Sequence, residues 1–267
     1  MSRALCAVLL AIAATATTAA AGDCRHSEPR DATLDAAGAT AIEITSVGGW
    51  LEVVGSAHLD RVEVDARACA DRERALERMQ LLTDRRGDTL VVEARIDDGV
   101  GGWGASPRLE MKVRVPAGLA VTIDDGSGWI KVSGTASLKI EDGSGDITVR
   151  DVAGEVDVED GSGDIDIRAC GEVRIDDGSG DIEIGGVATL RVDDGSGDVE
   201  IRDVTGDVIL TDGSGDLRVA GVGGDVLVEG DGSGGIRVSE VAGDLTVERD
   251  GSGGIHHEDV RGAVRLP

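Results

Sequence analysis

One four-residue motif, Asp-Gly-Ser-Gly, recurs through the C-terminal half of this 267-residue chain and constrains its fold more than any other feature. Self-similarity at a short, nearly fixed period is typical of stacked repeat units, each of which contacts only its neighbours. The sequence therefore predicts a repeat architecture rather than a globular domain. The eight copies, separated by 17, 18, 17, 17, 18, 19 and 19 residues, begin at Asp125, Asp142, Asp160, Asp177, Asp194, Asp212, Asp231 and Asp250.

Each repeat holds two short segments in which apolar and polar residues alternate, with a second corner between them. After Asp142 these segments are residues 146–150 and 155–159, and the corner is Val152-Ala153-Gly154. Alternation places the apolar residues on one face of an extended strand, and parallel stacking about 4.8 Å apart buries that face. We predict an all-β, single-chain parallel β-helix (a β-solenoid) with coils of 17–19 residues, right-handed as parallel crossovers usually are. An antiparallel sandwich is the alternative, but its loops rarely repeat in sequence.

The first third of the chain is less regular. The segment Gly48-Gly49-Trp50-Leu51 resembles residues 126–130, so we expect degenerate coils to begin near Thr40. Residues 71–78 are the expected short helix, and residues 89–96 and 108–115 are expected strands. Because terminal units of solenoids are commonly atypical, we assign residues 23–115 to an N-terminal cap region and residues 116–267 to the regular solenoid.

The N-terminus has the order of a secretory signal peptide. A basic start at Arg3 precedes an apolar run and the small residues Ala19-Ala20-Ala21-Gly22, so we expect residues 1–22 to be removed on export. No later segment is long enough to cross a membrane as a helix. We therefore expect the protein in the periplasm, at the cell surface or outside the cell.

Export makes the cysteines informative, because disulfides form in oxidising compartments. Cys24, Cys69 and Cys170 remain after signal removal and allow three pairings. We favour Cys24–Cys69, since both lie outside the regular repeats, and expect Cys170 to be a small buried residue at a corner where other repeats carry Val. No Cys-x-x-Cys pair points to a metal site.

Charge and composition exclude one class of partner. The chain carries 52 Asp and Glu against 26 Lys and Arg, a net charge of −26, and contains three Trp but no Tyr or Phe. Phosphate backbones would repel such a surface, and aromatic residues that stack on bases are scarce. We do not expect nucleic-acid binding.

The Asp that opens each Asp-Gly-Ser-Gly motif allows two interpretations. In the structural one, its carboxylate accepts backbone N–H groups of the turn and glycine supplies a positive φ. In the functional one, stacking aligns the eight Asp residues in a column, with Asp146 and its equivalents in a second column. Unit charges 4.8 Å apart repel by roughly 0.9 kcal/mol in water and about 3–4 kcal/mol at an effective dielectric constant of 20. Bound Ca²⁺ would relieve this repulsion, although the repeat is not the nine-residue calcium-roll pattern. We expect no other cofactor and assign no firm metal site.

Outward strand positions form the candidate binding surface. Charged residues of both signs follow one another along the stack at these positions, which mostly stabilises neighbouring coils. Ile209 and Leu227 instead make a small apolar step that a partner could contact.

Signatures of catalysis are sparse, so we predict no enzyme and no catalytic residues. The four His residues occupy no recognisable nucleophile or metal motif. Arg86-Gly87-Asp88 spells a cell-attachment tripeptide, but it is also an ordinary hairpin turn. A carboxylate pair could act as in β-helical polysaccharide hydrolases and lyases, yet those enzymes usually build a groove from long loops, which this chain lacks.

The repeated Gly-Ser-Gly-Asp-Ile-x-Val and Val-x-Gly-Asp-Val-x-Val patterns over about residues 40–266 resemble the bacterial putative-adhesin family of β-strand-repeat domains. That family consists of exported domains of unknown function that are similar to adhesin heads. The resemblance implies an adhesin-like or envelope interaction protein whose partner is a protein or polysaccharide of the envelope or surface. Because the sequence shows no C-terminal membrane barrel after the repeats, we do not expect a self-anchoring adhesin. The alternatives are a polysaccharide-active hydrolase or lyase, and a purely structural envelope scaffold.

Overall fold

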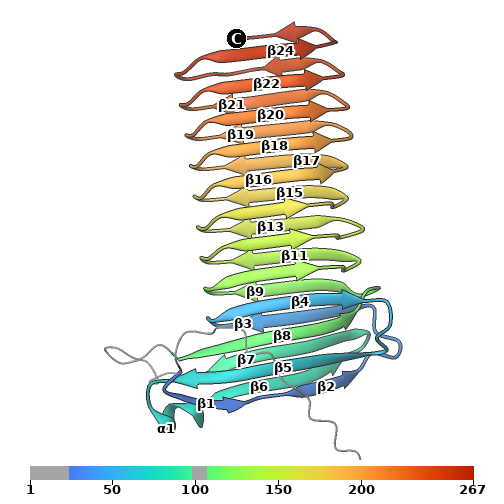
Figure 1. The fold of residues 1–267 in the computed structure, drawn as a ribbon, viewed down its shortest axis with the longest axis vertical. Coiled ribbons are helices and arrows are strands. Elements are labelled where there is room, and N and C mark those ends of the chain that lie inside the picture. The colour runs from blue at the N-terminus through green and yellow to red at the C-terminus, as the bar shows by residue number, and fades with distance from the viewer. Residues whose placement is uncertain (1–23, 98–106) are drawn as a thin grey trace, which may run out of the picture.

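The computed structural model describes residues 24–97 and 107–267 and shows a β-solenoid that stands on an N-terminal cap (Figure 1). Two sheets, of 13 and 12 strands among these residues, face each other along the stack. The signal-peptide prediction lies outside the described residues. Within the described ranges, no helix has the length and apolar character needed to cross a lipid bilayer.

Each regular coil contributes one strand to each sheet, and every such strand pairs in parallel with its equivalents in the neighbouring coils. This parallel pairing confirms the β-solenoid and rules out the antiparallel sandwich. Sheet A contains β10 (Trp129–Ser133), β12 (Ile147–Arg150), β14 (Ile165–Arg168), β16 (Ile182–Val187), β18 (Val199–Val204), β20 (Leu217–Val222), β22 (Ile236–Val241) and β24 (Ile255–Val260). Sheet B contains β9 (Ala120–Asp125), β11 (Ser137–Asp142), β13 (Val156–Asp160), β15 (Glu172–Asp177), β17 (Thr189–Asp194), β19 (Val208–Asp212), β21 (Val226–Asp231), β23 (Leu245–Val247) and β25 (Val264–Arg265).

Aliphatic side chains fill the space between the two sheets. In one coil Ile147 and Val149 of sheet A and Val156 and Val158 of sheet B are fully buried, as the alternating pattern predicts. Equivalent residues repeat in register in the next coil, so each column stacks residues of similar shape and forms one continuous core. Burying a Val, Leu or Ile side chain contributes roughly 1.5–3 kcal/mol, and a β-branched column suits the extended backbone.

The first coil lies between strands that come later in the chain. It consists of β3 (Ala41–Ser46) and β4 (Trp50–Ser56), which pair in parallel with β9 and β10 on one side. On the other side they pair with β7 (Thr89–Ile96) and β8 (Arg108–Pro116). Figure 1 shows these two strands between the cap and the regular stack. The predicted start near Thr40 agrees with this arrangement, whereas the order of the coils was not foreseen.

Antiparallel strands close the N-terminal end. β5 (Arg61–Ala70) pairs with β8, and it also pairs with β1 (His26–Pro29) and β2 (Ala32–Asp35). β6 (Met79–Arg86) and β7 form a hairpin, so Arg86-Gly87-Asp88 spans a turn as expected. The helix α1 (Glu73–Leu76) is shorter than the expected 71–78: Arg72 makes no side-chain capping bond, and Met79 already starts β6.

Candidate functional site

The Asp residue of each Asp-Gly-Ser-Gly motif lies on the inward face of sheet B. In β9 the inward positions are Val121, Ile123 and Asp125, so the carboxylate follows two aliphatic residues at the same period. We call the seven equivalent residues the inner Asp column; the final copy, Asp250, is only half-buried. The column consists of Asp125, Asp142, Asp160, Asp177, Asp194, Asp212 and Asp231, which are 2–8% exposed.

One oxygen of six of these carboxylates has a structural role; the exception is Asp231, where neither oxygen accepts a hydrogen bond. The backbone N–H of Ser144 donates to Oδ1 of Asp142 at 3.2 Å, and Ser196 donates to Asp194 at 3.1 Å. The last glycine of the motif takes a positive φ, as at Gly180 with +150°. These contacts confirm the structural interpretation of the motif.

The other oxygen is without a partner. Oδ2 of every residue in the inner Asp column is buried and accepts no hydrogen bond. None of the ion pairs found in residues 24–97 and 107–267 includes one of these seven carboxylates. A buried polar atom without a partner is rare in native proteins and calls for a specific explanation.

Burial raises the pKa of these carboxyls, since the apolar corner disfavours the charged form. The pKa rises from 3.8 to about 6 at Asp142, Asp160, Asp177 and Asp194, and to about 7 at Asp212. Neighbouring carboxylates raise it further: Asp125 and Asp160 act on Asp142, and Asp194 and Asp231 act on Asp212. The pKa of Asp125 and of Asp231 is also raised, again mainly by burial.

A second column of Asp residues is exposed and bonds to the backbone. Oδ1 of Asp146 accepts the backbone N–H of Asp164 in the next coil at 3.3 Å, and Asp164 accepts from Asp181 in the same way at 3.1 Å. Asp181 and Asp198 repeat this contact. The second column of the sequence analysis therefore links coils through main-chain contacts.

An acidic hollow lies at the corner that ends the strands of sheet B. Its volume is about 400 Å³. Outward carboxylates such as Glu141 and Glu159 lie in it beside residues of the inner Asp column, and Lys139 Nζ contacts these two at 2.8 and 3.5 Å. The lining residues are Asp124, Asp125, Glu141, Asp142, Gly143, Glu159, Asp160 and Asp176.

The structure brings Ile209 and Leu227 together on the outer face of sheet B. They are direct neighbours in the register of β19 and β21, as predicted, and both are half-buried. Arg191 precedes Ile209 in the same column. The apolar step is therefore real, although neither residue is among the large hydrophobic residues that are most exposed.

Two tryptophans that the sequence analysis did not single out as a pair stack on the outer face of sheet A. Trp50 of β4 and Trp129 of β10 are paired in register, with ring centroids 5.4 Å apart and ring planes 8° apart. Trp129 is 44% exposed. The matching segments around Trp50 and Trp129 could have revealed the pair, because equivalent positions of adjacent coils lie side by side.

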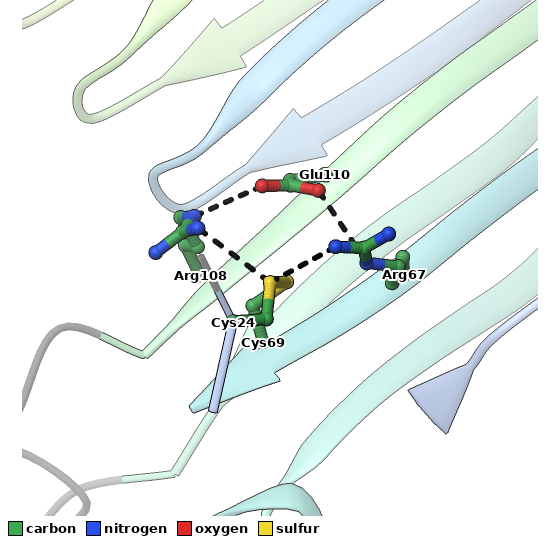
Figure 2. Close-up of a disulfide and its surroundings, with 5 residues drawn as sticks. All are labelled: Cys24, Arg67, Cys69, Arg108 and Glu110. Atoms are coloured by element: carbon green, nitrogen blue, oxygen red, sulfur yellow. Dashed lines mark hydrogen bonds and ion pairs between the residues drawn. A yellow bond between two sulfur atoms is a disulfide. The ribbon is translucent and has the colours of Figure 1, made fainter. Parts of the chain in front are cut away.

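The predicted disulfide joins Cys24 to Cys69, with an S–S distance of 2.05 Å. Figure 2 shows Arg67 and Arg108 on either side of it. Their Nη2 atoms donate to Cys24 Sγ at 3.2 and 3.6 Å, and both side chains form ion pairs with the buried carboxylate of Glu110. Cys24, Cys69 and Glu110 are close enough to suggest a metal site, but the disulfide already occupies both sulfur atoms. Cys170 is free and buried, as expected.

Comparison with known protein families finds a match for most of this chain. The family model described as Toastrack DUF4097 matches residues 72–258. The chain belongs to this family. The matched span of the Toastrack chain runs from the cap helix into β24, so it includes all eight copies of the motif and excludes the first coil. A comparison with curated proteins finds no match.

Several solved bacterial structures resemble this Toastrack protein in fold. One is a "putative adhesin" from Bacteroides fragilis, with 12% identity, a TM-score of 0.39 and coverage of 91% of this chain and 98% of that chain. A "putative lipid binding protein" from Parabacteroides distasonis has 18% identity, a TM-score of 0.48 and coverage of 91% and 94%. A "putative cell adhesion protein" from Clostridium sporogenes has 11% identity, a TM-score of 0.35 and coverage of 90% and 99%.

Proposed function

We propose that this protein is an exported, non-catalytic, adhesin-like protein of the cell envelope that binds a surface component through an outer face of its solenoid. The partner is a polysaccharide or a protein of the envelope or cell surface. The observation that carries the proposal is the stacked pair of Trp50 and Trp129 on the outside of sheet A.

Trp is enriched among the residues that contribute most to binding, because its ring offers a large apolar face together with an N–H donor. Trp129 stands out because the chain contains only three aromatic residues. The second ring, Trp50, and the parallel strands below hold its indole in one orientation. A rigid aromatic group loses little conformational entropy when a ligand packs against it.

Two polar residues neighbour Trp129 in the sheet. Asp146 of the next coil lies beside Trp129, since its carbonyl accepts the N–H of Ile130 at 2.9 Å. Lys131 lies two residues further along the same outward face. An aromatic surface with a few adjacent polar groups suits a ligand that has both apolar and hydroxyl-bearing faces, such as a sugar ring.

Two further observations support a non-catalytic role. The corners are short, as in the five residues 151–155 between β12 and β13. The buried carboxylates of the inner Asp column lie inside the solenoid, where a polymeric substrate has no access.

The Cys24–Cys69 disulfide supports an oxidising, extracytoplasmic location.

The test is retention of the purified protein on a panel of envelope polysaccharides and on intact cells. We expect saturable retention without release of new sugar ends, and we expect Trp129→Ala to reduce retention at least about tenfold. The matched variant Ile209→Lys/Leu227→Lys tests the apolar step on sheet B in the same assay. If only the second variant loses retention, the binding face lies on sheet B instead. Release of new sugar ends would support a hydrolase or lyase. If the unmodified protein is not retained at all, the proposal is overturned.

A further inference from the structure

The inner Asp column concentrates negative charge inside the solenoid. Its seven Oδ2 atoms are buried, accept no hydrogen bond and face no basic side chain in an ion pair within the described part of the chain. The neighbouring charges that act most strongly on Asp142 and Asp212 are other carboxylates. Placing an unpaired carboxylate in an apolar environment is strongly unfavourable, so above the pH at which these groups bind a proton they require a compensating cation.

The spacing of the column fits one kind of cation. Consecutive members are direct partners in parallel strands, as Asp160 is to Asp142 and to Asp177. Parallel strands lie about 4.8 Å apart, so an ion midway between two equivalent oxygens would be about 2.4 Å from each. Ca²⁺ binds oxygen ligands at about 2.3–2.6 Å, whereas Mg²⁺ requires about 2.0–2.1 Å and regular octahedral geometry.

An approach for cations exists at the same corner. The acidic hollow of about 400 Å³ is lined by Asp and Glu at every position except Gly143, and it includes three members of the column. A concave surface of one charge sign raises the local concentration of counterions. The hollow would therefore supply divalent cations next to the inward carboxylates.

We propose that the inner Asp column binds Ca²⁺ between successive coils, each ion bridging the Oδ2 atoms of two adjacent Asp residues. Backbone carbonyls of the turn and water would complete the coordination. Among residues 24–97 and 107–267, no three carboxylates converge on one point, so each ion has few charged ligands. Few charged ligands correspond to weak sites, with dissociation constants of about 10⁻⁴–10⁻³ M, as in extracellular calcium-binding modules. This inference does not rest on the proposed function.

The experiment measures thermal unfolding of the purified protein at pH 7.5, in chelator, in 10 mM CaCl₂ and in 10 mM MgCl₂ at one ionic strength. We expect Ca²⁺ to raise the unfolding midpoint by at least about 3 °C and Mg²⁺ to have a much smaller effect. The inner variant Asp160→Asn/Asp177→Asn/Asp194→Asn should lose most of the Ca²⁺ effect. Its matched control, Glu155→Gln/Glu172→Gln/Asp207→Asn, removes the same charge from exposed outward positions at the opposite ends of the sheet B strands, outside the acidic hollow, and should keep the effect.

The possible outcomes distinguish Ca²⁺ binding at the inner Asp column from Ca²⁺ binding at surface carboxylates and from general screening of the negative charge. Equal shifts with Ca²⁺ and Mg²⁺, no shift with either ion, or loss of the Ca²⁺ effect in the outward control alone would each overturn the proposal. If the inner variant does not fold, equilibrium dialysis with ⁴⁵Ca²⁺ decides the question. Equal saturable binding to the unmodified protein and to the outward control supports the column, and absence of saturable binding refutes it.

Discussion

At the scale of single residues, the Asp of most of these turns combines a favourable contact with an unfavourable one. Oδ1 accepts the serine N–H that shapes the corner, as at Asp177, where the distance is 3.2 Å. Oδ2 lies buried without a partner in the same side chain. Asn would keep the accepting oxygen and remove the charge, so the two contributions can be separated by substitution.

We predict that Asp177→Asn stabilises the protein at pH 8 and has little effect at pH 4, with divalent cations chelated. The pKa of Asp177 is about 6 in the folded state, above the ordinary 3.8, so the folded protein binds more protons between these values. Its contribution to stability is therefore complete below about pH 4 and is lost as the pH rises through about 6. Thermal unfolding followed by circular dichroism across this range is the measurement.

The control for this prediction is Asp176→Asn, which removes one negative charge from the neighbouring outward position. The difference between the Asp177 variant and the unmodified protein should grow between pH 4 and pH 7. A variant that is destabilised equally at both ends of the range would contradict a buried, protonatable carboxyl at this position.

The surroundings of the last glycine of the turn leave no room for a side chain. A Cβ at Gly180 would lie 1.8 Å from the carbonyl oxygen of Gly163 in the preceding coil, and φ is +150°. We predict that Gly180→Ala lowers the free energy of unfolding by at least about 2 kcal/mol. Urea unfolding measures this change.

Gly126 provides the comparison for Gly180. It belongs to the first copy of the same motif, no atom lies within 4 Å of its added Cβ, and its φ is not positive. Gly126→Ala should change the free energy of unfolding by no more than about 0.5 kcal/mol. Similar losses in the two variants would show that close stacking of the coils is not what requires glycine.

At the scale of elements, the cap and the first coil form one unit. β4 lies between β8 and β10, although residues 57–107 separate it from β8 along the chain. The disulfide holds the start of the described chain to the end of β5, beside Glu110 of β8. Unfolding that starts at this end would therefore expose the first coil before it spreads to the regular coils.

We predict that Cys24→Ala/Cys69→Ala lowers the free energy of unfolding by about 3–4 kcal/mol, since the bond closes a loop with a sequence separation of 45 residues. Hydrogen exchange should show faster exchange first in β1, β2 and β5, with β13 to β22 still protected. The control is Cys170→Val, which introduces the residue found at the same corner as Val152 and Val187, and it should change stability by less than about 1 kcal/mol. Uniform loss of protection along the whole stack would contradict a local role for the bond.

The sequence predicts the elements better than it predicts their order. The strand at residues 89–96 and the stacking of Ile209 on Leu227 agree with the structure, because period-two alternation and the repeat spacing determine both. The position of β3 and β4 between later strands depends on long-range pairing, which no local pattern encodes. The helix is shorter than predicted: its start has no side-chain cap, and β6 already begins at Met79.

The candidate sites show the same division between local and long-range information. Asp125 follows Ile123 by two residues and therefore lies on the same inward face of the strand. The burial of the inner Asp column could thus be predicted from the sequence. The absence of a partner for the Oδ2 atoms could not be predicted, because it depends on which side chains surround the corner in three dimensions. The matching segments around Trp50 and Trp129 mark the two residues as equivalent, but the structure is needed to show that their coils are neighbours, because residues 57–128 separate β4 from β10 along the chain.

At the scale of the whole molecule, the solenoid behaves as a series of nearly equivalent coils. The register passes from β15 to β17 and from β17 to β19 without a break, and the same core columns continue through each step. Stability in such proteins is approximately a sum of terms for single units and for interfaces between neighbours. A coil should therefore be removable, provided that the two new neighbours meet in the original register.

We predict that deletion of residues 178–194 gives a folded protein that is one coil shorter. The deletion joins Asp177 to Gly195, so an intact Asp-Gly-Ser-Gly motif forms at the junction and β15 can pair with β19. The same strand signal per residue in circular dichroism, cooperative unfolding and a moderately lower unfolding midpoint are the expected results. Deletion of residues 178–185 is the control, because it removes the turn and most of β16 and joins one strand of sheet B directly to the next corner. That shorter deletion should abolish cooperative unfolding; if both deletions behave alike, the coils are not independent units of the fold.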